Sequence, residues 1–170
     1  MLDDVKQLIL LFNETFADFN TELVAGEDEP IYLPAGEGRV KHQIVFAHGF
    51  YASALHEIAH WCIAGEQRRQ LEDYGYWYKA DGRNQQQQLD FEKVEYKPQA
   101  VECGLARAAG RTFQVSVDNL SGFQSDRHAF AAAVEEQYQL YLQQGFPARA
   151  QKFMTVLNKA KQALVEVAND

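Results

Sequence analysis

The sequence is poor in several features that mark specialised classes of protein. It contains only two cysteines, Cys62 and Cys103, among 170 residues. Two cysteines embedded in apolar sequence do not make a disulfide framework, so a reducing compartment is expected. No stretch approaches the roughly 18 consecutive apolar residues that a membrane helix needs. Asp3 and Asp4 occupy the place where a secretory signal carries positive charge. We therefore expect a cytoplasmic protein with no membrane contact.

Positive charge is scarce as well. Lysine and arginine number 16 against 24 aspartates and glutamates, which gives a formal net charge of -8 at pH 7. Nucleic-acid binding relies on clustered lysines and arginines that neutralise phosphates, so this charge argues against it. An acidic surface suits a basic partner, although acidity also serves solubility alone. The sequence does not set the oligomeric state, and a monomer is compatible with it.

The overall composition is that of an ordinary globular protein. Hydrophobic residues make up 46% of the chain and charged residues 24%, which lies outside the range in which chains stay disordered. A chain of this length fits one domain, and no internal repeat or composition change divides it. We therefore predict a single domain over residues 1–170.

The hydrophobic pattern predicts a mostly helical α+β fold with a small sheet. Apolar residues recurring every three to four positions predict amphipathic helices, and β-branched or alternating runs predict strands. Residues 74–78 suggest an extended aromatic segment, and the glutamines at 85–88 suggest a linker or a helix start. The predicted helices cover residues 2–19, 50–64, 98–109, 126–143 and 147–167, and the predicted strands cover 31–33, 43–47 and 112–117.

The segment that carries chemistry is His56-Glu57-Ile58-Ala59-His60, inside a predicted helix that is apolar nearly all round. Residues four apart share one helix face, so both imidazoles can bind the same ion. Burying two histidines and a glutamate together is unfavourable unless a partner compensates them. A divalent cation compensates all three, so the motif predicts a metal centre rather than core histidines bonded to backbone carbonyls.

A third ligand must come from elsewhere, because catalytic zinc and iron usually take three protein ligands and keep other positions open. We choose Glu102, which lies in apolar sequence near the start of the predicted 98–109 helix, where a lone charge needs a partner. Glu95 is the reserve candidate. The spacing of about 40 residues from His60 excludes the compact three-histidine metzincin pattern. The His-x-Asp pair of jelly-roll oxoglutarate enzymes is absent from the sequence.

Several other residues are candidates for the site. Cys62 and Cys103 each adjoin a proposed ligand and could be soft ligands, although burial as small hydrophobes is the commoner role. His48 precedes the motif by eight residues and could face the substrate. A long cationic side chain could also pack on aromatic residues through cation–π attraction, and the candidates for this are Tyr76, Trp77 and Tyr78.

Four motifs stand out when they are taken together. They are His-Glu-Ile-Ala-His-Trp-Cys-Ile-Ala-Gly at 56–65, Asp-Tyr-Gly-Tyr-Trp-Tyr at 73–78, Asp-Gly-Arg at 81–83 and Lys-Pro-Gln-Ala-Val-Glu-Cys at 97–103. Over essentially the whole chain, the sequence resembles the bacterial elongation factor P hydroxylase family. The resemblance implies hydroxylation of the elongation factor P lysine that bears a β-lysyl group. It also implies a zincin-like, metallopeptidase-like fold and a metal site of two histidines and one carboxylate, which map onto His56, His60 and Glu102.

The implied reaction bears on the metal. Hydroxylating an unactivated C–H bond needs a metal that changes oxidation state and binds dioxygen, which ferrous iron does and zinc does not. We therefore expect Fe(II) and dioxygen, with an unknown reductant, and Glu57 positioning water or a proton near the ion. Two alternatives stay open. One is a zinc peptidase in which Glu57 is the general base, and the other is a non-catalytic binding module whose metal is closed by a fourth protein ligand such as Cys103.

Overall fold

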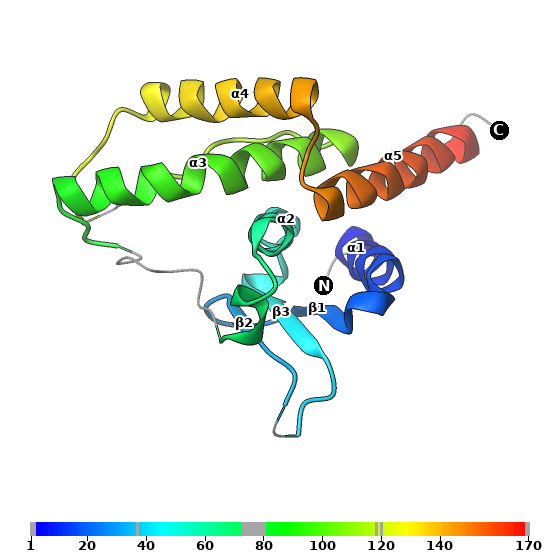
Figure 1. Cartoon of the computed structure of the whole chain (residues 1–170). Coiled ribbons are helices and arrows are strands. Elements are labelled where there is room, and N and C mark those ends of the chain that lie inside the picture. The colour runs from blue at the N-terminus through cyan, green and yellow to red at the C-terminus, as the bar shows by residue number, and fades with distance from the viewer. Residues whose placement is uncertain (1–2, 37, 73–80, 118, 120, 169–170) are drawn as a thin grey trace.

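One helix, α2 (Tyr51–Ile63), occupies the centre of the computed structural model, which describes residues 3–36, 38–72, 81–117, 119 and 121–168. Figure 1 shows α2 end-on, with the sheet on one side and α3 (Gln85–Ala108) crossing it on the other. This position confirms the prediction that the motif helix lies inside the core. Its buried residues are Ala54, Leu55, Ile58, Ala59, Trp61 and Cys62.

The remaining helices surround α2. α1 (Asp3–Thr15) and α5 (Ala148–Ala168) pack near each other beside it, whereas α4 (Arg127–Gln144) runs alongside α3 (Figure 1). Short 3-10 turns lie at Ala17–Phe19 (η1), Ala47–Gly49 (η2) and Arg68–Gln70 (η3). Four of the five predicted helices are confirmed as α1, α2, α4 and α5. Among the described helices, none is both long and apolar enough to cross a membrane.

Three short strands form one sheet in the order β1-β3-β2. β1 (Thr21–Ala25) pairs with β3 (His42–Phe46) in parallel, and β2 (Ile31–Leu33) pairs with β3 in antiparallel. Leu23 lies opposite Ile44, and Phe46 follows two residues later on the same face; all three are at most 3% exposed. This face joins the core. β2 and β3 confirm two predicted strands, whereas β1 was not predicted.

An aromatic cluster ties α1, α2 and α5 together. Phe12, Phe16, Trp61 and Phe153 pack with ring centroids 4.8 to 5.8 Å apart in tilted or edge-to-face arrangements, which are favoured geometries for aromatic pairs. They belong to a hydrophobic core to which α1, β1, β3, α2, α3 and α5 all contribute. The prediction of a mostly helical, single-domain α+β fold is therefore confirmed.

Two arginines bind the C-terminal end of α2. Arg149 Nη2 donates to the carbonyls of Trp61, Cys62 and Ala64. Arg69 Nη1 also donates to the Ala64 carbonyl, at 3.1 Å. The last carbonyls of a helix lack partners within the helix and carry partial negative charge, so cations stabilise them. The two arginines thereby hold the end of the helix one turn after the His56–His60 motif.

The predicted helix start at Pro98 is wrong, because α3 begins at Gln85 and runs through Pro98. Asn84 caps the helix: its side chain accepts the Gln87 N–H at 2.9 Å, and the Gln87 side chain accepts the Asn84 N–H at 3.0 Å. This reciprocal pair is a capping box. Pro98 has no N–H for the Val94 carbonyl, a loss that typically costs about 3 kcal/mol. Burial of α3 between α2 and α4 offsets this cost.

The predicted strand at 112–117 is also wrong, because this segment has no regular secondary structure. Its backbone pairs with helix side chains instead of another strand. The Gln99 amide binds both the N–H and the carbonyl of Ser116. Gln88 Nε2 donates to the Val117 carbonyl at 3.3 Å. Val115 and Val117 pack against a second hydrophobic cluster, so the alternating pattern reflects burial of one side of the segment without a sheet.

Candidate metal centre

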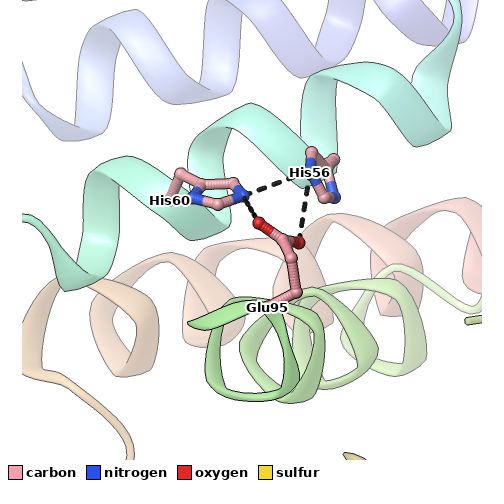
Figure 2. Close-up of side chains that lie close together, drawn as sticks. All are labelled: His56, His60 and Glu95. Atoms are coloured by element: carbon pink, nitrogen blue, oxygen red, sulfur yellow. Dashed lines mark hydrogen bonds and ion pairs between the residues drawn. The ribbon is translucent and has the colours of Figure 1, made fainter. Parts of the chain in front are cut away.

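Three side chains converge where α2 and α3 cross. His56 and His60, one turn apart on α2, bring their Nε2 atoms to 3.2 Å. Glu95 of α3 places Oε1 at 3.1 Å from the His60 Nε2 and Oε2 at 3.9 Å from the His56 Nε2. One ligand atom from each residue lies within 4.8 Å of the others. Figure 2 shows the three side chains pointing toward one another, and Glu95 is almost fully buried.

The arrangement suits one cation. Two nitrogens that bind the same ion at about 2.1 Å, with an angle of 90° to 109° at the ion, lie roughly 3.0 to 3.4 Å apart. The Nε2 separation of 3.2 Å falls within this range. Two imidazoles and a carboxylate are also the donor types of catalytic zinc and non-haem iron. The residues therefore fit a metal ion that keeps coordination positions for water or substrate.

Glu102 binds the opposite edge of the His56 ring. Its Oε2 lies 2.8 Å from the His56 Nδ1, so the Nδ1 hydrogen is donated to the carboxylate and the Nε2 lone pair is left facing His60 and Glu95. A carboxylate on the distal nitrogen fixes the ring and tautomer of a metal-binding histidine. The structure thus places Glu102, the expected third ligand, on the Nδ1 side of the His56 ring, away from the two Nε2 atoms. It places the reserve candidate Glu95 beside the two Nε2 atoms.

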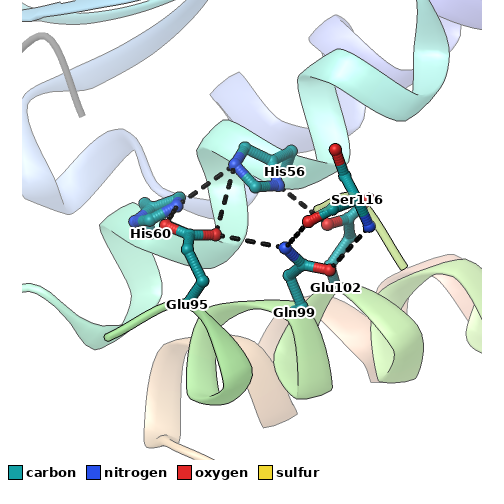
Figure 3. Close-up of polar contacts among 6 residues, drawn as sticks. All are labelled: His56, His60, Glu95, Gln99, Glu102 and Ser116. Atoms are coloured by element: carbon teal, nitrogen blue, oxygen red, sulfur yellow. Dashed lines mark hydrogen bonds and ion pairs between the residues drawn. The ribbon is translucent and has the colours of Figure 1, made fainter. Parts of the chain in front are cut away.

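Gln99 links Glu95 to the backbone at Ser116 (Figure 3). Its Nε2 donates to the Ser116 carbonyl at 2.7 Å and to the Glu95 Oε2 at 3.3 Å, and its Oε1 accepts the Ser116 N–H at 2.9 Å. Ser116 presents one donor and one acceptor, so the amide has one orientation that satisfies both, and its second hydrogen faces Glu95. Gln99 is fully buried, which restricts the Glu95 carboxylate.

Neither Gln99 nor Ser116 was singled out from the sequence. Glu95, Gln99 and Glu102 are spaced by four and three residues, which places them on one face of a continuous helix. That spacing was the available signal for Gln99. Nothing local marks Ser116, because its backbone rather than its side chain makes the contact.

The surrounding carboxylates make the centre favour positive charge. Burial alone would lower the pKa of His56. The hydrogen bond and the charge of Glu102, helped by the charges of Glu57 and Glu95, outweigh burial and raise that pKa to about 10. Burial raises the pKa of Glu57, and the neighbouring carboxylates raise it further against the opposing imidazoles. A metal ion would supply the positive charge that a proton otherwise supplies here.

A cavity of about 450 Å³ adjoins the centre. His60, Glu95 and Glu57 line it, so the middle glutamate of the motif faces the same space as two of the ligand candidates. Within the described part of the chain, the Glu57 carboxylate makes no hydrogen bond or ion pair. The remaining walls are mainly apolar and include Ile44, Ile63, Val94 and Pro98, together with Arg68 and Arg69 of η3.

The other predicted site residues lie outside this arrangement. His48 is exposed in η2, its ring centroid is 5.9 Å from that of Phe50, and it is not among the described residues that line the cavity. Cys103 packs in the second hydrophobic cluster, and both thiols are free and buried. Substrate contacts of the aromatic run stay a prediction, since the residues concerned lie beyond the described part of the chain: Tyr76, Trp77 and Tyr78.

Comparison with known proteins agrees with the motifs. The sequence matches the elongation factor P hydroxylase family over residues 11–169. It is also 50% identical over 167 residues to an elongation factor P lysine hydroxylase of Haemophilus influenzae, which covers 98% of this chain and 92% of that protein. Both matches extend well beyond the His56–His60 motif. The chain therefore belongs to the elongation factor P hydroxylase family.

Proposed function

We propose that this protein hydroxylates a lysine side chain of elongation factor P, using a metal ion held by His56, His60 and Glu95. The observation that carries the proposal is the convergence of two imidazole nitrogens and one carboxylate on one point beside a cavity. The name of the Haemophilus influenzae relative supports the reaction and the protein substrate. Because that substrate is a translation factor, we also propose a cytoplasmic location.

The proposed metal is iron. Bound to two imidazoles and one carboxylate, Fe(II) supplies dioxygen activation for C–H hydroxylation, which zinc cannot supply because it has no accessible redox change. The protein holds the ligands in place. Glu102 keeps the hydrogen of His56 on Nδ1, and Gln99 restrains the Glu95 carboxylate. Dioxygen is the proposed cosubstrate, and the reductant stays unassigned.

We further propose that the substrate lysine carries a β-lysyl group, as the family resemblance implies. A side chain lengthened in this way needs space beside the metal. The cavity next to His60 and Glu95 provides such space and so supports the proposal. A zincin-like arrangement is part of the same proposal. Its support is the motif helix α2, which packs on β3 on one side and receives Glu95 from the following helix on the other.

A zinc peptidase is the second candidate, because Glu57 adjoins His60 at the cavity, where a general base for metal-bound water would stand. The binding-module alternative has less support. A structural metal site is usually closed by four protein ligands, whereas three converge in the described part of the chain, and Cys103 packs elsewhere.

Dependence of the reaction on dioxygen distinguishes a hydroxylase from a zinc peptidase. The protein is purified without air, loaded with Fe(II) and incubated with β-lysylated elongation factor P and a reductant, with and without dioxygen. The expected product is elongation factor P heavier by one oxygen atom, formed only with dioxygen. His60→Asn should abolish it, whereas His128→Asn, at an exposed site on α4, should not. Peptide cleavage, or an equal yield under argon, would contradict the proposal.

A further inference from the structure

The cavity beside the metal centre is lined by a carboxylate that is not one of the proposed metal ligands. Glu57 follows the first ligand histidine directly and lines the cavity with His60 and Glu95. The other two carboxylates have partners: Glu95 faces the imidazole nitrogens and Gln99, and Glu102 accepts from His56. Glu57 has none among the described residues. It is therefore the carboxylate available to a ligand in the cavity.

The three carboxylates around the metal centre carry more negative charge than a bound divalent ion can neutralise. Glu57, Glu95 and Glu102 contribute three negative charges, and metal-bound imidazoles are neutral. A dication supplies two positive charges, so one negative charge remains. Glu95 and Glu102 already have partners, so Glu57 is the carboxylate of the three that an added positive charge can approach. A partly buried carboxylate is stabilised when a partner with opposite charge and hydrogens to donate approaches it.

The walls of the cavity suit an aliphatic chain. Val94 of α3 and Ile63 of α2 line it and are 54% and 37% exposed, so apolar surface lies open beside the half-buried Glu57 and the buried Glu95. Pro98 also lines the cavity and lacks the N–H that would satisfy the Val94 carbonyl within the helix. Methylene groups pack on such walls while a charged end reaches a polar group.

The two arginines that line the cavity lie beyond the C-terminal end of α2, whereas Glu57 lies near the middle of that helix. Arg68 and Arg69 belong to η3, which follows the end of α2. Glu57 precedes the end of α2 at Ile63 by six residues, or about 9 Å of helix rise. An ammonium group is repelled by the arginines and attracted by the carboxylate, so the cavity favours one orientation of a cationic ligand.

We propose that this cavity binds the amine-bearing, lysine-derived side chain of the substrate, with an ammonium group paired to Glu57 and the aliphatic stem against Val94 and Ile63. The inference rests on the proposed function and adds to it the residue that recognises the charge of the substrate. Glu57 then selects side chains that carry a free amine. It does not serve as a general base, because hydroxylation needs no base to activate water.

Kinetics with two forms of the substrate test this role. Semisynthetic elongation factor P carries a β-lysyl group with either free or N-acetylated amines, and wild type is compared with Glu57→Gln. Acetylation should raise the KM of wild type roughly tenfold or more, as expected for loss of one charge-assisted hydrogen bond. Glu57→Gln should raise the KM for the free-amine substrate by a similar factor and should be insensitive to acetylation.

Two further variants make the result specific. Glu57→Asp keeps the charge and should retain part of the discrimination between the two substrates. Glu66→Gln removes a carboxylate that is exposed just beyond α2 and does not line the cavity, so it should behave as wild type. Metal content should be equal in all four proteins. A Glu57→Gln enzyme that loses kcat at unchanged KM, equally for both substrates, overturns the inference.

A binding experiment separates this inference from the proposed function. Isothermal titration of Co(II)-loaded protein with cadaverine, an aliphatic diamine, should show one site that Glu57→Gln weakens at least about tenfold. Pentanediol, with the same length and no charge, should bind to neither protein. Equal cadaverine affinity in wild type and Glu57→Gln rejects the cavity assignment, whether or not wild type hydroxylates elongation factor P. Absence of hydroxylation with Glu57-dependent cadaverine binding rejects the proposed function alone.

Discussion

Replacing Gln99 by leucine removes three hydrogen bonds from the interior without adding a charge. Two of them join the amide to the Ser116 backbone, at 2.7 and 2.9 Å. At about 1 kcal/mol each, their loss should lower the free energy of unfolding by about 2 kcal/mol. For a chain of this size, that corresponds to a fall in Tm of roughly 4 to 8 °C.

The third bond, from Gln99 to Glu95 at 3.3 Å, affects the metal rather than the fold. Removing a group that holds a metal ligand typically weakens metal binding 10- to 100-fold, or about 1.4 to 2.7 kcal/mol. The assay is a Co(II) titration against a competing chelator, in which the Co(II) absorption spectrum also reports ligand geometry. We expect Gln99→Leu to weaken binding within this range and to change the spectrum.

Gln88→Leu is the matched control. Gln88 is also fully buried on α3 and also binds the 112–117 segment, through the Val117 carbonyl, but it makes no contact with Glu95. Its replacement should lower Tm at least as much and leave Co(II) affinity close to that of wild type, since distant sites act independently. A Gln99→Leu protein that loses stability but keeps wild-type Co(II) affinity and spectrum would refute the positioning role.

Other contacts give predictions of their own. Glu95→Gln should weaken Co(II) binding more than Glu102→Gln, for which a 10- to 100-fold loss is expected; the reverse order would favour Glu102 as ligand. Burial raises the pKa of Cys62, and that of Cys103 to about 11, so iodoacetamide should modify neither thiol until unfolding, and native-state alkylation seen by mass would contradict this. Asp126 accepts two backbone N–H groups at the start of α4. Asp126→Ala should therefore cost about 1 kcal/mol in urea unfolding, and an unchanged midpoint would argue against the cap.

The sequence was informative where one local pattern determines the structure. The hydrophobic pattern located α1, α2, α4 and α5, because each of these helices buries side chains in the core. The four-residue spacing of His56 and His60 placed both imidazoles on the same side of α2, where they meet. These features depend on residues close together in the chain, and so they could be predicted without knowing what packs against them.

The third ligand depended on the extent of α3. Treating Pro98 as a helix start left Glu95 outside the helix and favoured Glu102. The Asn84–Gln87 capping box starts the helix earlier, so Glu95 and Glu102 lie two turns apart, about 10 Å along its axis. One carboxylate therefore meets the Nε2 side of His56 and the other meets the Nδ1 side. Only the way in which α2 and α3 cross determines which carboxylate is the ligand candidate and which one binds the Nδ1 side of His56.

The strand predictions failed for a related reason. Alternating burial in the 112–117 segment indicates that one side faces a core, but it does not reveal what completes the backbone hydrogen bonds. Here Gln88 and Gln99 do so. β1 (Thr21–Ala25) escaped prediction because its parallel pairing partner, β3, lies about twenty residues further along the chain. Both features depend on contacts between distant segments.

The position of the metal tests the central claim most directly. Crystals of the protein grown without air and loaded with Fe(II), measured at wavelengths on either side of the iron absorption edge, give an anomalous difference map. We predict one strong peak, at about 2.0 to 2.3 Å from the Nε2 atoms of His56 and His60 and from the Glu95 carboxylate. A map without a peak there, or with the iron on the Glu102 side of His56, would contradict the account.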